Sequence, residues 1–94
     1  MFNEKAKYII IEGEFGVEAP IVFSHLLTHV SVAGGRKVLG AGKVSFGVVA
    51  DPNDRGYEPR MVMEANCYGE SISLGIKSRG YEDDKLIEQY ILNK

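Results

Sequence analysis

The feature that most constrains the fold of this chain is the alternation of side chains along several short segments. Residues 17–23 and 61–67 place small or apolar residues at every second position, and residues 38–48 do so with glycines in the pattern. Residues 70–76 alternate in the same way with serine and glycine. Because successive side chains of a strand point to opposite faces, this period is typical of half-buried strands. It predicts a mainly antiparallel sheet.

Residues 8–11 and 17–23 predict a first hairpin with a glycine-containing turn. Pro20 cannot donate a ladder hydrogen bond, so its strand is expected at a sheet edge or at a bulge. The glycines of residues 38–47 predict a bend or a close approach by another backbone. Residues 61–76 predict a second hairpin that turns at positions 68–70.

Two helices are expected. Ser24 can cap a helix that runs to Ala33 and ends at a glycine pair, with an apolar stripe at helical spacing. The second, of about a dozen residues, follows the acidic run 82–84, because the helix dipole favours negative charge in the first turn. The expected order is ββ-α-β-ββ-α. The expected fold class is α+β, a sheet of about five strands with both helices packed on one face.

Length and charge exclude several classes of protein. With 94 residues, we expect one domain spanning 1–94 and no room for a doubly wound nucleotide-binding sheet or a barrel enzyme. The formal net charge of −2 gives no electrostatic basis for general nucleic-acid binding. Cys67 is the single cysteine, which excludes an internal disulfide, and no signal peptide or membrane span of about 20 apolar residues is present. We therefore expect a cytoplasmic protein without membrane contact.

His25 and His29 form a candidate metal pair. Their i, i+4 spacing on a helix would place both imidazoles on one face, as two zinc ligands require. A third ligand would have to come from a glutamate of the first hairpin. The alternative is a pair of histidines at the helix surface or at a packing edge, and no cofactor is then expected.

Arg36 and Lys43 enclose a glycine-rich stretch that superficially resembles a phosphate-binding loop. The G-x-x-x-x-G-K-[ST] motif is incomplete, because Lys37 stands where glycine is required and Val44 where a hydroxyl is required. The stretch fits the end of a helix followed by a strand. The positive charge still allows an anion or nucleotide site.

The chain contains serine and cysteine residues that could act as nucleophiles, but none of them lies in a known catalytic motif. Ser71 and Ser73 do not lie in a nucleophile elbow, and we expect them on the polar face of a strand. Cys67 alternates in register with Met61, Met63 and Ala65, so we interpret it as a small core residue.

Residues 77–84 gather a guanidinium, a phenol, a hydroxyl and three carboxylates between the last strand and the final helix. One interpretation is helix capping, with Arg79 paired to a carboxylate. The other is a polar rim around a partner or ligand site, formed by Ser78, Arg79 and Tyr81, because arginine and tyrosine are favoured interface anchors. Arg55 and Tyr57, in the loop 51–60, would form the opposite wall.

Two stretches carry a family resemblance: A-P-I-V-F-S-H-L-L-T-H-V-S-V-A at 19–33, and Y-G-E-S-I-S-L-G-I-K-S-R at 68–79, followed by the acidic run. Together they resemble small accessory proteins encoded by bacteriophages and prophages. The resemblance transfers no active-site residues. It implies a protein, acting in the host cytoplasm, that inhibits or sequesters a host component, including defence enzymes and their nucleotide messengers, and that often forms homo-oligomers.

Three functions follow as hypotheses. The first is a non-catalytic phage-type binding protein that occludes a host protein or traps a small anionic ligand. The second is a small metal-dependent enzyme centred on His25 and His29. The third is a structural subunit of a virion or a larger assembly. Exposed sheet edges at the Pro20 strand and at the glycine-rich strand 38–47 predict a homodimer or a higher homo-oligomer.

Overall fold

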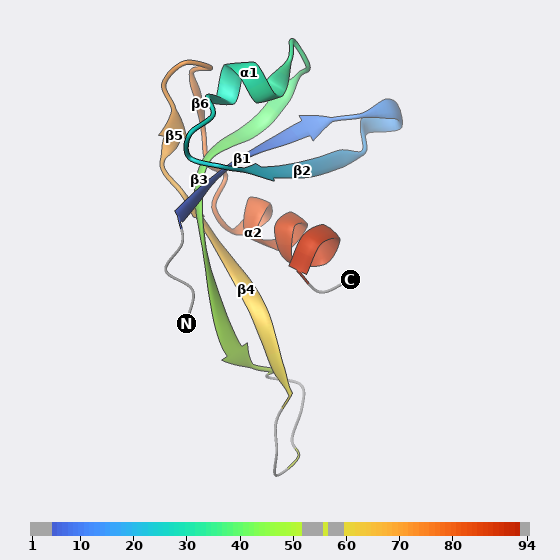
Figure 1. Ribbon diagram of the computed structural model, residues 1–94. Helices are drawn as coiled ribbons and strands as arrows, with labels where there is room; N and C mark the ends of the chain where they lie inside the picture. The colour runs from blue at the N-terminus through green and yellow to red at the C-terminus, as the bar shows by residue number, and fades with distance from the viewer. Residues whose placement is uncertain (1–4, 52–55, 57–59, 93–94) are drawn as a thin grey trace.

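The computed structural model describes residues 5–51, 56 and 60–92 and confirms the α+β class (Figure 1). A four-stranded antiparallel sheet and a two-stranded sheet are accompanied by two helices. No helix of the described residues is both long enough and apolar enough to cross a membrane. The elements are β1 Lys5–Glu12, a 3₁₀ turn Glu14–Gly16, β2 Glu18–Phe23, α1 His29–Ala33, β3 Val38–Ala50, β4 Met61–Tyr68, β5 Glu70–Ser71, β6 Ile76–Lys77, α2 Tyr81–Ile87 and a π-helical turn Glu88–Leu92.

The main sheet has the strand order β2-β1-β3-β4. β1 is central because its unbroken Tyr8–Ile11 run is suited to burial on both faces. The expectation that Pro20 lies in an edge strand is confirmed, since β2 is outermost. The glycine-rich strand is not outermost, since β3 lies between β1 and β4. Residues 38–45 of β3 pair with β1 and residues 43–50 pair with β4, so among the described residues only 43–45 are paired on both sides.

The two helices lie on opposite faces of the sheet, not on one face as the sequence predicts (Figure 1). Tyr8 and Ile10 pack in a core with Ile87 of α2. Ile9 points the other way and packs with Ala33 of α1. Because β1 is apolar at consecutive positions, both of its faces need a cover, and one helix serves each face.

The first helix is much shorter than the sequence predicts. Thr28, not Ser24, is its N-cap, and the Thr28 hydroxyl accepts a hydrogen bond from the Ser31 amide at 3.1 Å. The Ser24 hydroxyl instead accepts from the Leu26 amide in a separate turn. The β-branched residues around position 30 favour a helix weakly, so local turn hydrogen bonds prevail over a longer helix. Leu26 is 81% exposed as a result and contributes nothing to the predicted buried stripe.

The predicted second hairpin is also different. β4 pairs with β3, and residues 72–75 form a turn where the return strand was expected. Ser71 Oγ accepts from the Leu74 amide at 3.2 Å, which closes this turn locally. β5 and β6 therefore form a two-residue ladder of their own, in which Glu70 pairs with Lys77 and Ser71 with Ile76.

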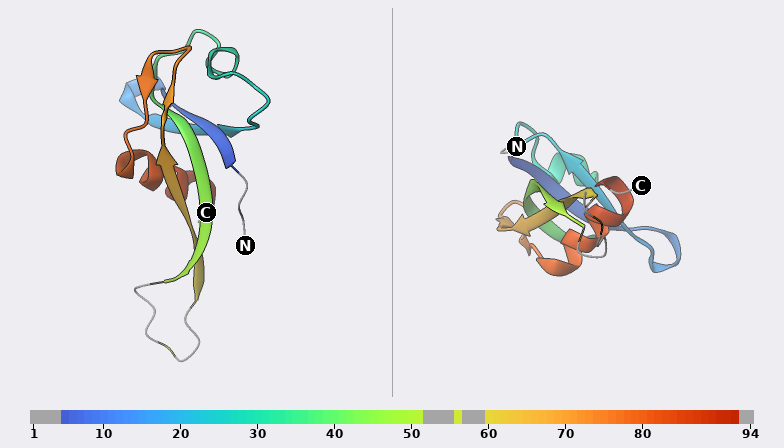
Figure 2. Two further views of the ribbon diagram at one scale, coloured as in Figure 1. Left: turned by 90° about the vertical axis from the view of Figure 1, so that its left-hand side faces the viewer. Right: turned by 90° about the horizontal axis from the view of Figure 1, so that it is seen from below.

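β3 and β4 continue beyond the body of the domain as a two-stranded arm (Figure 2). We define the arm as residues 46–50 of β3 and 61–65 of β4, which pair in register from Phe46–Ala65 to Ala50–Met61. Beside the body, α2 and the π-helical turn lie against β4 (Figure 1). Val48 and Met61 are exposed on the arm.

The turn between β1 and β2 contains an unusual backbone conformation. Phe15 has φ 60°, a left-handed value that non-glycine residues rarely adopt, and its side chain is 100% exposed. We expect Phe15→Gly to raise the free energy of unfolding by about 0.5 kcal/mol, because relief of the strain exceeds the added entropy of the unfolded chain. Urea denaturation would measure the change, with Val17→Gly, at an ordinary φ of −67°, as a destabilised control. A loss of stability in Phe15→Gly would contradict this reading of the turn.

Candidate functional site

A buried polar network joins β1 to the start of α2. Asp83 is 0% exposed, and its Oδ2 accepts from the Tyr8 hydroxyl at 2.6 Å and from the Arg79 amide at 2.9 Å. Its Oδ1 accepts from Arg79 Nε at 2.8 Å. The Tyr8 hydroxyl also lies 2.7 Å from Ser78 Oγ. Both carboxylate oxygens are satisfied, as a buried charge requires.

Arg79 extends this network to the sheet edge. One terminal nitrogen of its guanidinium donates to Glu18 of β2 at 2.6 Å, and the other lies 3.5 Å from Glu82. Burial alone would lower the pKa of Arg79, but hydrogen bonds to Glu18 and Asp83 outweigh it and raise the pKa. This arginine therefore fastens β2 to α2 as a permanently charged clamp.

Arg79 pairs with a carboxylate, as the helix-capping interpretation expects, but the N-cap of α2 is Gly80 and it makes no side-chain cap hydrogen bond. Ser78 and Arg79 are held by partners inside the molecule, and Ser78 Oγ also accepts from the Gly80 amide at 3.0 Å. Tyr81 is exposed, with the Lys85 ammonium 4.9 Å from the centre of its ring. Arg55 and Tyr57, the predicted opposite wall, lie outside the described residues. A partner site at Tyr81 stays a prediction.

Two potentially reactive groups are buried beside the same network. Burial raises the pKa of the Tyr8 hydroxyl, and the hydrogen bond to Asp83 raises it further. Burial likewise raises the pKa of the Cys67 thiol. Because a thiol reacts as its thiolate, Cys67 is a poor nucleophile in the folded protein. This agrees with its interpretation as a small core residue.

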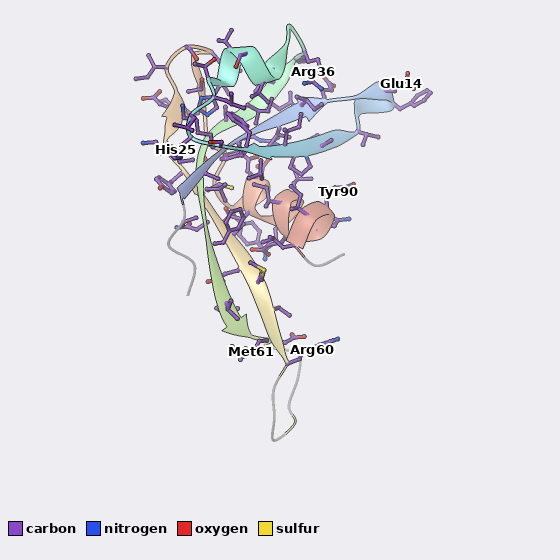
Figure 3. All side chains as sticks on the ribbon, in the orientation of Figure 1. Glu14, His25, Arg36, Arg60, Met61 and Tyr90 are labelled. Atoms are coloured by element: carbon purple, nitrogen blue, oxygen red, sulfur yellow. The ribbon has the colours of Figure 1, made fainter. Side chains whose placement is uncertain are left out.

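The two histidines do not share a helix face. His25 is exposed in the turn before α1 (Figure 3), whereas His29 is buried at the first helical position. His29 Nε2 lies 2.9 Å from the Gly42 carbonyl oxygen, and the ring packs edge-on against Phe23 at 5.4 Å. The i, i+4 geometry predicted for a metal pair is therefore wrong, because the helix begins four residues too late. Within the described parts of the chain, no three His, Cys, Asp or Glu side chains are grouped to hold a metal ion.

Arg36 and Lys43 are also separated. Arg36 donates to the carbonyl oxygens of Ala33 at 2.8 Å and Val32 at 2.7 Å, so it caps the C-terminus of α1. Lys43 lies on β3, exposed, and it lines a hollow at the other end of the helix. Arg36 and Lys43 therefore do not contribute to one common anion site.

The hollow has a volume of about 300 Å³ and lies between the segment leading into α1 and the β5–β6 turn. Lys7 and Lys43 both line the hollow and lie directly opposite each other in the β1–β3 ladder. The Lys7 ammonium donates to the Leu27 carbonyl oxygen at 3.0 Å. No described residue pairs with the Lys43 ammonium. The other lining residues are Thr28, His29, Glu70, Ser71, Ile72 and Ser73.

The electrostatics of the hollow favour an anion. Two lysines and one glutamate give its lining a formal charge of +2 − 1 = +1. Like charges directly opposite in a ladder destabilise a sheet by up to about 1 kcal/mol. Ser73, exposed and with its Oγ 3.3 Å from that of the buried Ser71, adds a hydroxyl group that can donate a hydrogen bond to a ligand. The arrangement can bind a small anion, and its positive charge comes from two strands far apart in the chain.

Neither the role of Lys7 nor the Tyr8–Asp83 pair is predicted from the sequence. A signal for the pair exists, because a tyrosine within an apolar strand run needs a buried partner for its hydroxyl. No sequence signal pairs Lys7 with Lys43, since the register of β1 on β3 depends on the whole sheet.

Comparisons with protein-family models, with curated proteins and with solved structures found no match for this chain.

Proposed function

We propose that this protein is a non-catalytic binding protein that takes up a small, phosphate-bearing anion in the hollow above Lys7 and Lys43. The observation that carries the proposal is the cross-strand lysine pair, one member of which has no partner among the described residues. An anion between the two ammonium groups would replace their repulsion with two charge-assisted hydrogen bonds.

The size of the hollow limits the ligand class. A volume of about 300 Å³ stands at the lower end of the range for small-molecule sites. It suits a phosphate with one attached sugar or base better than a dinucleotide. Ile72, 89% exposed at the rim, offers an apolar surface on which a base or another flat group could lie.

Binding without turnover is supported by how the reactive side chains are engaged. Ser71 is buried and hydrogen-bonded to the Leu74 amide, and His29 is directed to a backbone carbonyl oxygen. The two groups therefore lack the paired geometry of a nucleophile and its base. The separation of His25 from His29 counts against the metal-dependent enzyme.

The biological role we propose follows from the resemblance to phage and prophage accessory proteins. Such a protein would withhold a small anionic host metabolite or messenger from the host enzyme that uses it. Sequestration requires affinity and abundance but no chemistry, which suits a small domain with one polar hollow.

The test is isothermal titration calorimetry with inorganic phosphate, AMP and ribose 5-phosphate. We expect at least one of them to bind, and Lys43→Glu to weaken that binding at least tenfold, because it reverses a charge that lines the hollow. Lys37→Glu is the matched control. It makes the same change at an exposed lysine whose partner, 3.0 Å away, is Glu12, and it should leave the affinity within twofold.

Two results of the titration would contradict the proposal. Absence of binding by all three compounds, or an equal loss in both lysine variants, would remove the hollow as the site. Phosphorus NMR of the bound compound over hours adds a second arm, since any conversion to product would show that the protein is an enzyme.

A further inference from the structure

We infer that residues 46–50 of β3 form the interface with a second copy of this chain, by antiparallel pairing across a two-fold axis. The inference specifies the surface of the homodimer that the sequence predicts. It is independent of the ligand proposed for the hollow, which lies on the body of the domain and not on the arm.

The other edges of the main sheet are protected at particular positions, which are Pro20 on β2 and the Ala65 and Cys67 amides on β4. β2 carries Pro20, which has no N–H to offer to another strand. β4 is covered by acidic side chains of the C-terminal helical segment: Asp84 Oδ1 accepts from the Cys67 amide at 2.6 Å, and Glu88 Oε2 accepts from the Ala65 amide at 3.0 Å. These carboxylates take the place of the carbonyl oxygens of a fifth strand.

The far part of β3 has no such protection among the described residues. Because the Ala65 amide points to Glu88, the Phe46–Ala65 position of the ladder is not hydrogen-bonded between β3 and β4. Hydrogen-bonded and non-hydrogen-bonded pairs alternate along an antiparallel ladder, so the pairs formed by Val48 and Ala50 are also not hydrogen-bonded to β4. Phe46, Val48 and Ala50 therefore direct their N–H and C=O groups away from β4. On that side, β1 pairs with β3 only as far as Ser45 within the described residues.

The chemistry of this edge favours a copy of itself. Residues 46–50 read Phe-Gly-Val-Val-Ala, with no charge and no proline, so a two-fold contact brings no like charges together. A two-fold axis at Val48 sets this residue against its own copy and Phe46 against Ala50. The exposed apolar side chains of Val48 and Met61 would then continue across the interface. A two-stranded ribbon is marginal alone, and pairing converts two arms into one four-stranded sheet.

Sedimentation velocity of the full chain at about 100 µM tests the inference. We expect the wild type to sediment as a dimer, twice the chain mass of 10.4 kDa, and Val48→Lys to sediment as a monomer with an unchanged circular dichroism spectrum. Val17→Lys is the control, because it adds the same charge at a similarly exposed valine, and it should remain dimeric. A monomeric wild type, or a dimer that Val48→Lys leaves intact, overturns the inference.

A cross-link tests the register. Opposed residues of a hydrogen-bonded antiparallel pair have Cα atoms about 5.5 Å apart, within disulfide range. Because Cys67 is buried, Val48→Cys supplies the reactive thiol, and mild oxidation should give a covalent dimer that Val17→Cys does not give. Absence of that dimer overturns the proposed two-fold.

Discussion

Asp83→Ala is expected to lower the free energy of unfolding by about 3 kcal/mol. The variant removes the carboxylate that accepts hydrogen bonds from the Tyr8 hydroxyl and from Arg79 Nε. Tyr8 is 0% exposed, so water cannot replace the carboxylate, and Ser78 Oγ at 2.7 Å is the partner that its hydroxyl keeps. Arg79 keeps Glu18 as a partner, which limits the loss.

Equilibrium urea denaturation, followed by circular dichroism, measures this effect. Glu82→Ala is the matched control: it removes a neighbouring carboxylate of the same helix turn, 3.5 Å from Arg79 and exposed to solvent. Exposed ion pairs contribute about 0–1 kcal/mol, so we expect a change within that range. Equal effects of the two variants would mean that the buried network does not stabilise the fold as its geometry indicates.

Gly42→Ala is the second large effect, with an expected destabilisation of about 2 kcal/mol. A Cβ on Gly42 would overlap the Tyr68 carbonyl oxygen and lie 3.3 Å from the Gly69 carbonyl carbon. These are backbone atoms of the β4–β5 connection, so they cannot move aside as a flexible side chain would. The Gly42 carbonyl oxygen also holds His29, which would be displaced with the strand.

Gly47→Ala is the control for this position. It lies in the same strand, and its added Cβ would approach nothing closer than a Glu64 side-chain atom at 3.7 Å, an ordinary contact. We expect its thermal unfolding midpoint to equal or exceed that of the wild type, because alanine reduces the entropy of the unfolded chain. If Gly42→Ala melted at the same temperature, the close approach of the two backbones would be wrong.

The proposed dimer edge and the lysine pair lie on the same strand. Lys43 pairs with Lys7 within the β1–β3 ladder, and beyond Ser45 β3 continues past β1 as the arm. The ligand proposal and the dimer proposal can fail separately, since Lys43→Glu and Val48→Lys alter different parts of this strand.

Part of the site could be predicted from local sequence. The acidic start of the last helix and the pairing of Arg79 with a carboxylate follow from rules that act within a few residues. The helix at 24–33 could not be placed well, because weak helix formers let two short turns compete with it. The prediction that both helices pack on one face was wrong, because Ile9 and Ile10 are equally apolar, point in opposite directions and each need a cover.

Local patterns were enough to predict the α+β class, the antiparallel sheet, the edge position of Pro20 and the C-terminal helix. Periodicity, proline and charge at helix ends act over a few residues, so they can be recognised in a single chain. The burial of Asp83 against Tyr8 and the pairing of Lys7 with Lys43 depend instead on long-range packing. Both are contacts between residues far apart in the chain, and they arise from the register of strands and from the face on which each helix packs.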